Sequence, residues 1–511
     1  MRMKVLAILA LIGAFPAAAQ EKTAIPDFGA LSDTELYAML VDLETEGFRD
    51  PCQRKVPFFA EVVRRNPTNA LLRNGSLTAQ AFCAYEENRH EEGLELLKQA
   101  ERAATGPTFH GLGLYFAVQV GDGEEALARL RAMGHEGLLD QLPDQQVFFA
   151  VRIIQADGLA GELDELAYEL TDTTEFERLD PDLQGTFATA AIRHAVGAGD
   201  LSRIESLLQY DADPSSYLNM LSDRAYAAAW PQIEQRAGEN LAVVADAFVR
   251  RTSEQLAEAP EDRDRLSRYA HALHFAGRYQ EAVDVARNWR PERDNLGGLQ
   301  EGDAWALNIE AYALDALGRR EVADAVFDQL ATLPADEHYW VVNFVINRAA
   351  RLVGQGRWEE GLAATELARS VAAEYGSTYA KMLIARDRTC ALQRLGRADE
   401  SVHEAEYLVE QFAESPPVAA TGLLCVGKRP EVEQLLASAL SDEVARNRLI
   451  YELQDPRFEL FYTPSVLPQV REVVFAEAAL RDEAFRYIRL LPDRFLPISY
   501  IRRMQIAARV P

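Results

Sequence analysis

This chain of 511 residues has few of the side chains and phrases that mark catalytic or metal-binding proteins. It contains four cysteines and eight histidines, and no two cysteines stand in the CxxC spacing of zinc or thioredoxin-type sites. No HExxH, Gly-x-Ser-x-Gly or P-loop phrase occurs. His271 and His274 could share one helical face toward a metal, but no third ligand accompanies them. We therefore expect no enzyme activity, no cofactor, and no catalytic, cofactor-binding or metal-binding residues.

Positive charge is also scarce. The 53 lysines and arginines face 80 aspartates and glutamates, and the net charge is −27. Such a field repels phosphate groups, which argues against nucleic acid as a partner. Residues 481–511 depart from this average, with arginines at 481, 486, 489, 494, 502, 503 and 509. This cationic end either docks an acidic partner or pairs with the acidic body of its own chain.

Long apolar runs are lacking beyond the N-terminus. There, basic residues 1–4 precede an apolar run over 5–15 and the small-residue stretch 16–19. The run is shorter than the ~20 residues that span a bilayer, which favours a cleaved signal peptide over a retained anchor. We expect a signal peptide over 1–19 with cleavage after Ala19, no integral membrane segment in the mature chain, and a periplasmic location.

Strand-type alternation and linkers rich in Gly, Ser or Pro are lacking too, and a helical repeat takes their place. A Gly-Arg phrase begins at Gly277, Gly318, Gly356 and Gly396, with spacings of 41, 38 and 40 residues. Around the first of these, residues 266–289 carry apolar side chains three and four positions apart on both sides of the glycine. One unit is therefore a helix, a tight turn at glycine, and a second helix.

These units resemble the tetratricopeptide repeat. Ala270, Gly277, Tyr279, Ala282 and Ala286 match small and aromatic positions of one unit, and Ala349, Gly356, Trp358, Gly361 and Ala368 match much of another. The departures are Arg320 and Ala398 at the aromatic position, Ser401 at a small position, and a period of about forty rather than thirty-four residues. Residues 224–258 also resemble a stretch of exported bacterial tetratricopeptide proteins of undefined role. The resemblance implies a superhelix of helical hairpins and no particular activity.

The same period extends in both directions. It meets turn-type residues at Asn88, Gly121, Gly158, Gly199, Gly238 and Gly427. The weak matches before residue 240 are either divergent repeats or generic hairpins, and the kept phase favours repeats. We expect an all-α solenoid of about nine or ten hairpins, with divergent repeats over 20–240, clearer repeats over 241–440 and a helical C-terminal cap over 441–511.

The cysteines fall into two groups. Cys52 and Cys83 are 31 residues apart and Cys390 and Cys425 are 35 apart, each about one repeat. Because corresponding helices of consecutive repeats lie side by side, each pair could form a disulfide in an oxidising compartment. The alternative is four buried thiols that pack as small apolar groups.

Aromatic residues near the turns have two interpretations as well. Tyr279, Trp305, Trp340 and Trp358 either fill the space between helices, which we favour, or anchor a ligand in a groove. The repeat array and the expected export indicate a non-catalytic periplasmic scaffold that binds a protein or peptide of the cell envelope. The alternative is a structural or glycan-binding accessory of envelope or exopolysaccharide assembly or export. The sequence does not indicate an oligomeric state.

Overall fold

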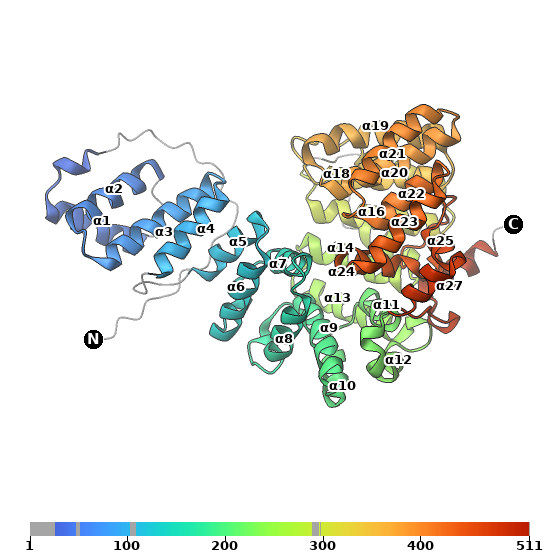
Figure 1. Cartoon of the computed structure of the whole chain (residues 1–511), viewed down its shortest axis with the longest axis horizontal. Helices are drawn as coiled ribbons and strands as arrows, with labels where there is room; N and C mark the ends of the chain where they lie inside the picture. The colour runs from blue at the N-terminus through green and yellow to red at the C-terminus, as the bar shows by residue number, and fades with distance from the viewer. Residues whose placement is uncertain (1–25, 47–51, 103–108, 289–295, 297, 510–511) are drawn as a thin grey trace. The chain divides into compact units, whose positions relative to one another are not determined.

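Helices make up nearly all regular structure in the computed structural model, which describes residues 26–46, 52–102, 109–288, 296 and 298–509 (Figure 1). The described residues fall into two compact units, which meet in the sequence between Ala190 and Ala191. Within them no strand forms, and an isolated bridge joins Asp223 to Ile488. The predicted all-α class is confirmed for this part of the chain.

In the first unit, helices that follow one another in the sequence pack as antiparallel pairs. They are α1 (Asp33–Glu46), α2 (Cys52–Arg65), α3 (Ala70–Glu86), α4 (His90–Arg102), α5 (His110–Val120), α6 (Gly123–Glu136), α7 (Asp144–Ala156) and α8 (Ala160–Leu170). The next helix, α9 (Pro181–Ala198), begins in this unit and ends in the second.

The second unit continues the pattern with helices of more varied length. They are α10 (Ile204–Leu208), α11 (Pro214–Ser222), α12 (Trp230–Ala237), α13 (Ala242–Glu258), α14 (Arg263–Phe275), α15 (Tyr279–Asn288), α16 (Glu301–Ala316), α17 (Arg320–Leu330), α18 (Val341–Gly354), α19 (Trp358–Tyr375), α20 (Thr378–Arg394), α21 (Ala398–Glu410), α22 (Pro416–Cys425) and α23 (Arg429–Ser441). Four more follow: α24 (Glu443–Ile450), α25 (Val470–Ala476), α26 (Ala478–Ala484) and α27 (Ile498–Ala507).

The hairpin turns fall where the period predicts them. Positive φ angles between 55° and 77° occur at Asn88, Gly121, Gly158, Gly199, Gly238, Gly277, Gly318, Gly356, Gly396 and Gly427. At nine of these ten turns the next N–H donates to the carbonyl five residues earlier, as Arg278 does to Leu273 at 2.9 Å. This bond closes the end of the first helix and needs a residue that tolerates the left-handed conformation. Each of these nine turns therefore has a residue in the left-handed conformation followed by a bond that closes the first helix.

The second helix of a hairpin packs closely against the first through a small residue. Ala282 and Ala323 are fully buried at this contact, and a Cβ on Gly361 would lie 2.6 Å from Val353 Cγ2. Ser401 replaces alanine without loss, because its hydroxyl donates to the carbonyl of Thr389 at 2.7 Å. This bond explains how a polar side chain fits a fully buried position.

Arginines join neighbouring helices in both units. Arg129 of α6 reaches Glu101 of α4, and Arg388 of α20 donates to Glu404 of α21 at 2.8 Å. Arg351 of α18 is 2% exposed and contacts carboxylates on α16 and α17. A buried guanidinium with bidentate partners fixes the register between helices, because any slip would leave a buried charge unpaired.

The segment over 441–511 contacts two parts of the second unit. Its first part, α24 to α26, packs against α22 and α23 around Val432, Leu436, Val473 and Leu480. The residues beyond α24 also return to helices near the start of the second unit. The domain boundaries at 240 and 440 stay predictions, and the signal peptide over 1–19 lies outside the described residues.

Candidate binding site along the hairpin turns

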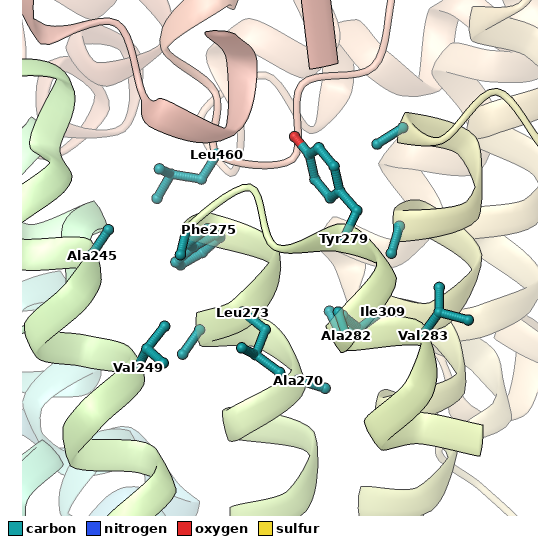
Figure 2. Close-up of a cluster of buried hydrophobic side chains, with 14 of the residues drawn as sticks. Ala245, Val249, Ala270, Leu273, Phe275, Tyr279, Ala282, Val283, Ile309 and Leu460 are labelled. Atoms are coloured by element: carbon teal, nitrogen blue, oxygen red, sulfur yellow. The ribbon is translucent and has the colours of Figure 1, made fainter. Parts of the chain in front are cut away.

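A long segment that follows α24 runs back across the ends of earlier helices. We call residues 451–509 the return segment. It crosses the edge at which the first helices of the hairpins end, close to the turn glycines. Figure 2 shows Leu460 of this segment above the turn that joins α14 to α15, next to Phe275 and Tyr279. This edge is our candidate site, because a later segment of the same chain lies against it.

Phe461 lies at the centre of this contact. Its ring is stacked on His271 with centroids 4.6 Å apart, and it lies 4.6 Å from the ring of His274 and 5.5 Å from that of Tyr312. Leu460 is 9% exposed and belongs to the same apolar cluster as Phe275. One aromatic and one aliphatic side chain of the return segment therefore fill a hollow lined by α14 and α16.

The two histidines are neutral in this environment. Burial penalises the imidazolium form and lowers the pKa of His271 to about 3, with Arg268 as a second cause. Burial likewise puts the pKa of His274 well below its ordinary value. His271 does not project to solvent as a ligand on an open helix face would. Among the described residues no group of three side chains is placed to hold a metal ion.

Further along, the return segment adds a backbone hydrogen bond to the next covered turn. The N–H of Val466 donates to the carbonyl of Gly354 at 2.9 Å, and Val466 Cγ2 would lie 3.6 Å from a Cβ on Gly356. Leu467 packs on a cluster that contains Val353 and Cys390. A Cβ on Gly354 would lie 3.4 Å from Ser465 Oγ, an ordinary contact distance, so the return segment lies directly against the end of α18.

A second strip of contacts lies at the start of the unit. Arg224 N donates to Tyr487 O at 2.8 Å and Arg489 N donates to Ser222 O at 2.9 Å, which forms the isolated bridge. The Arg489 guanidinium lies 3.7 Å above the Trp230 ring and 2.8 Å from Glu234. A cation over an indole with a carboxylate partner is a strong surface anchor.

The last strip is made by α27. The hydroxyl of Tyr279 donates to the carbonyl of Ser499 at 2.5 Å, and Arg503 donates to the carbonyl of Tyr462 at 2.8 Å. A Cβ on Gly277 would meet Arg502 Cγ at 2.6 Å. Gly277 thus serves two purposes, since it permits the turn and leaves room for α27.

Two exposed glutamates lie on the same segment. Glu459 is solvent-accessible, yet the protein atoms around it and the nearby carboxylates of Glu452 and Asp455 raise its pKa to about 7. Burial by its surroundings also raises the pKa of Glu452, and Arg386 opposes that shift. Water reaches both side chains, and this screening leaves them with little effect on the free energy of unfolding.

The seven arginines of residues 481–511 fall into two groups, according to whether they form an ion pair. Arg481 and Arg486 pair with Asp482 and Glu483, and Arg489 and Arg494 share Glu234. Among the described residues, ion pairs are not formed by Arg502, Arg503 or Arg509. Self-pairing thus accounts for four of the seven arginines.

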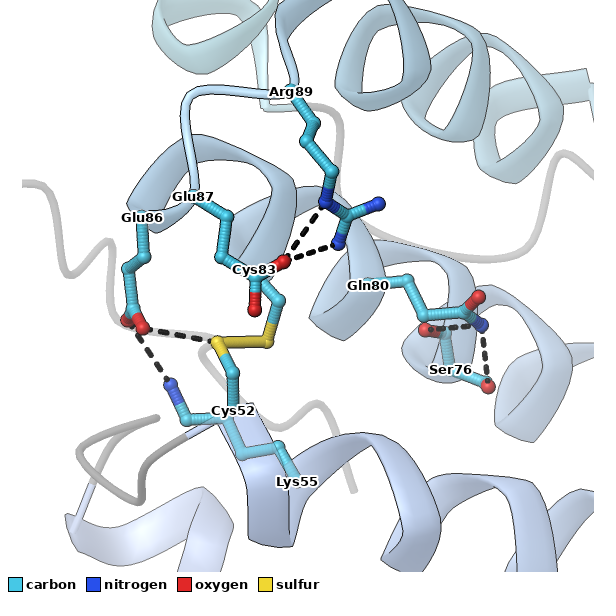
Figure 3. Close-up of a disulfide and its surroundings, with 8 residues drawn as sticks. All are labelled: Cys52, Lys55, Ser76, Gln80, Cys83, Glu86, Glu87 and Arg89. Carbon is cyan, nitrogen blue, oxygen red and sulfur yellow. Dashed lines mark hydrogen bonds and ion pairs between the residues drawn. A yellow bond between two sulfur atoms is a disulfide. The ribbon is translucent and has the colours of Figure 1, made fainter.

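The predicted cysteine partners lie at disulfide distance. The Cα atoms of Cys52 and Cys83 are 5.4 Å apart across α2 and α3, and those of Cys390 and Cys425 are 5.1 Å apart across α20 and α22. Figure 3 shows the first pair beside Glu86. The carboxylate is 2.9 Å from Cys52 Sγ and 3.7 Å from Lys55 Nζ. A disulfide sulfur has no proton to donate, so the ion pair with the buried Lys55 orients Glu86.

The aromatic residues singled out in the sequence pack between helices. Tyr279 and Trp340 are 3% and 7% exposed, and the rings of Trp305 and Phe344 are 4.9 Å apart. Trp358 lies 5.8 Å from the Arg394 guanidinium. The packing interpretation therefore holds for these side chains. The return segment was not foreseen, because none of its contacts is periodic in the sequence.

No helix in the described part of the chain combines the length and the apolar character needed to cross a bilayer. Neither a family model nor a curated protein matches the sequence. Among solved structures, Naa15/Naa10 bound to HypK-THB matches at 11% identity and a TM-score of 0.26, over 93% of this chain and 80% of that chain. The pentatricopeptide repeat protein PPR10 from maize matches at 13% identity and a TM-score of 0.27, over 94% of this chain and 75% of that chain. Likeness at this level carries no inference about partners or activity, and the repeat fold rests on the helices and turns of this chain.

Proposed function

We propose that this chain is an exported, non-catalytic scaffold of the tetratricopeptide type that binds a protein or peptide segment of the cell envelope. One observation carries the proposal: the edge formed by the hairpin turns holds an extended segment of the same chain. That segment is bound there by a backbone hydrogen bond at Gly354 and by side chains such as Phe461. A surface that recognises polypeptide in cis has the chemistry to recognise it in trans.

Part of the same edge is open. A Cβ placed on Gly318, Gly396 or Gly427 would have no neighbour within 4 Å, in contrast to Gly277 and Gly356. The open turns repeat the covered ones in conformation, with φ between 75° and 77°. They therefore offer further positions at which a partner segment can lie against the ends of the first helices.

Two features support export. The N-terminal pattern of basic, apolar and small residues is typical of a signal peptide. Both cysteine pairs lie at disulfide distance, and disulfides persist in oxidising compartments such as the periplasm. Together they favour a periplasmic location for the scaffold.

The test is capture from a cell-envelope extract with the purified, folded protein as bait, followed by reconstitution with each purified candidate. We expect one or a few proteins that bind in a saturable manner with a defined stoichiometry. A parallel incubation with purified peptidoglycan and with arrayed glycans should give no retention. Saturable glycan binding without any protein partner would contradict the proposal in favour of an envelope-glycan accessory.

A further inference from the structure

We propose that α27 covers a docking site for an amphipathic helix of a partner protein, and that the partner's helix takes the place of α27. The proposal rests on the proposed function, since it names one site and one partner chemistry for the scaffold. The site consists of the turn at Gly277, the start of α15 at Tyr279, and Tyr462 of the return segment.

One face of α27 makes all of these contacts. Ile498 and Ile506 pack against the apolar cluster that contains Phe275 and Tyr279, and Ser499 is 2% exposed under the Tyr279 hydroxyl. Arg502 lies between them on the same side, four positions from each isoleucine, and Arg503 lies at the edge of that face, three positions before Ile506. The partner helix should therefore carry two apolar residues eight positions apart. A small residue should directly follow the first apolar residue, and arginines should stand four and five positions after that same residue.

The arginine requirement has a physical basis at the site. The Arg503 guanidinium donates to the carbonyl of Tyr462, and the carboxylate of Asp315 favours its charge. Burial in this contact lowers the pKa of Arg503, so the site takes up a cation at a desolvation cost. A partner helix with an acidic residue at this position would be rejected, because neither the carbonyl nor the carboxylate accepts a negative charge.

α27 is held more weakly than the rest of the return segment. Of its ten residues only Ser499 is buried, and Met504 is 45% exposed. By comparison, the seven-residue helix α25 buries Val470, Val473 and Val474 in the core that caps the array. Few buried contacts mean a low free energy of local opening, which is the property of elements that exchange with ligands.

Attachment to the same chain gives α27 its advantage over a partner. A tethered helix acts at an effective concentration in the millimolar range, so it outcompetes a free helix of equal intrinsic affinity. Removing α27 from its site should expose the site to a helix added in solution. The full-length chain should resist that helix.

The experiment uses a fluorescein-labelled synthetic peptide of residues 496–511 as the probe. Two proteins expose the site: the full-length double variant Ile498→Asp/Ile506→Asp, and a chain that ends at Pro497. We expect both to bind the peptide at least about tenfold more tightly than the wild-type protein does, by fluorescence anisotropy. A control peptide with aspartate at positions 498 and 506 should not bind.

Three results would contradict the proposal that α27 covers a docking site. One is equal binding of the peptide to wild type and to both variants, and another is no binding to variants that keep their helical circular dichroism. The third is loss of cooperative folding in both variants, since a replaceable helix is not needed for the fold. Peptide binding without any envelope partner would contradict the proposed function alone. Partners captured equally by the double variant with and without saturating peptide would contradict this site alone.

Discussion

The hydroxyl of Tyr279 donates a hydrogen bond to the carbonyl oxygen of Ser499, 220 positions later in the chain, at 2.5 Å. It joins the first residue of α15 to the second residue of α27 and is buried. The bond is one of several that hold the return segment to helices that precede it by more than 200 residues. The second unit is thus closed by its own later residues.

Removing this bond should loosen α27 selectively. We expect Tyr279→Phe to lower the free energy of unfolding by about 1 kcal/mol, the usual net contribution of one such bond. Hydrogen exchange of residues 498–507 should accelerate in this variant. Tyr312→Phe is the matched control, because no hydrogen bond of the Tyr312 hydroxyl is present among the described residues. Equal acceleration in both variants would contradict the role of the Tyr279 bond.

The turn at Gly277 gives a second test of the same contact. Gly277→Ala and Gly318→Ala both place a Cβ on a residue with positive φ, at a cost of about 1–2 kcal/mol each. Only the Cβ at 277 would also collide with Arg502, whereas the Cβ at 318 meets open space. We expect faster exchange of residues 498–507 in Gly277→Ala alone. Similar exchange in both variants would mean that α27 does not rest on this turn.

Acid should weaken the contact of Phe461 with α14. The pKa of His271 is lowered to about 3 in the folded protein, and that of His274 is also well below its ordinary value. The unfolded chain binds a proton at each histidine below pH ~6.5, so stability is complete above that pH. It should fall by up to about 1.4 kcal/mol per pH unit for His271 as the pH drops toward 3, and His274 adds a loss of the same sign.

Thermal unfolding at pH 7 and pH 5 measures this effect when Glu459 is replaced by glutamine in every protein compared, because the pKa of that carboxyl is raised to about 7. His271→Phe/His274→Leu should have a smaller difference in Tm between the two pH values than the wild type. His403→Gln is the control, because the His403 side chain is 85% exposed. An unchanged difference in the double variant would show that the buried histidines do not set the acid sensitivity.

The repeat could be predicted from the sequence, but the packing of the return segment on the second unit could not. The reason is physical. A turn such as Gly277 is a local event that needs a residue tolerant of positive φ, so it leaves a mark in the sequence at each period. The environment of His271 depends instead on Phe461, which lies 190 residues later and has no periodic relation to it. Gly238 illustrates the limit within the repeat itself. It keeps the period, but the following Asn240 and Leu241 also have positive φ, and the turn differs from the other nine.

The ion pairs between helices should differ in worth according to burial. Arg351→Met leaves the carboxylate of Asp315, which is 3% exposed, without its partner, and should cost about 3–5 kcal/mol in denaturant unfolding. Arg397→Met removes an exposed, solvent-screened pair with Glu400 and should leave the unfolding midpoint nearly unchanged. The double variant Arg351→Met/Asp315→Leu should recover part of the loss. An equal loss of unfolding free energy in the two single variants would contradict the structural role of the buried Arg351–Asp315 pair.

Export, as proposed above, should leave both cysteine pairs oxidised. Mass spectrometry without reductant is expected to find Cys52 linked to Cys83 and Cys390 linked to Cys425. Each bond closes a loop of 31 or 35 residues, which the chain-entropy model values at about 3–4 kcal/mol. Replacing both members of one pair with serine should lower stability by that amount. Detection of four free thiols would remove this prediction.

A crosslinking experiment tests whether the return segment closes the second unit. A p-benzoylphenylalanine placed at position 502 of the full-length protein is irradiated, and the linked peptides are identified by mass spectrometry. We expect links to the peptide that contains Gly277 and Tyr279, because Arg502 lies against that turn. Links confined to residues 429–484, as a simple terminal cap would give, would contradict it.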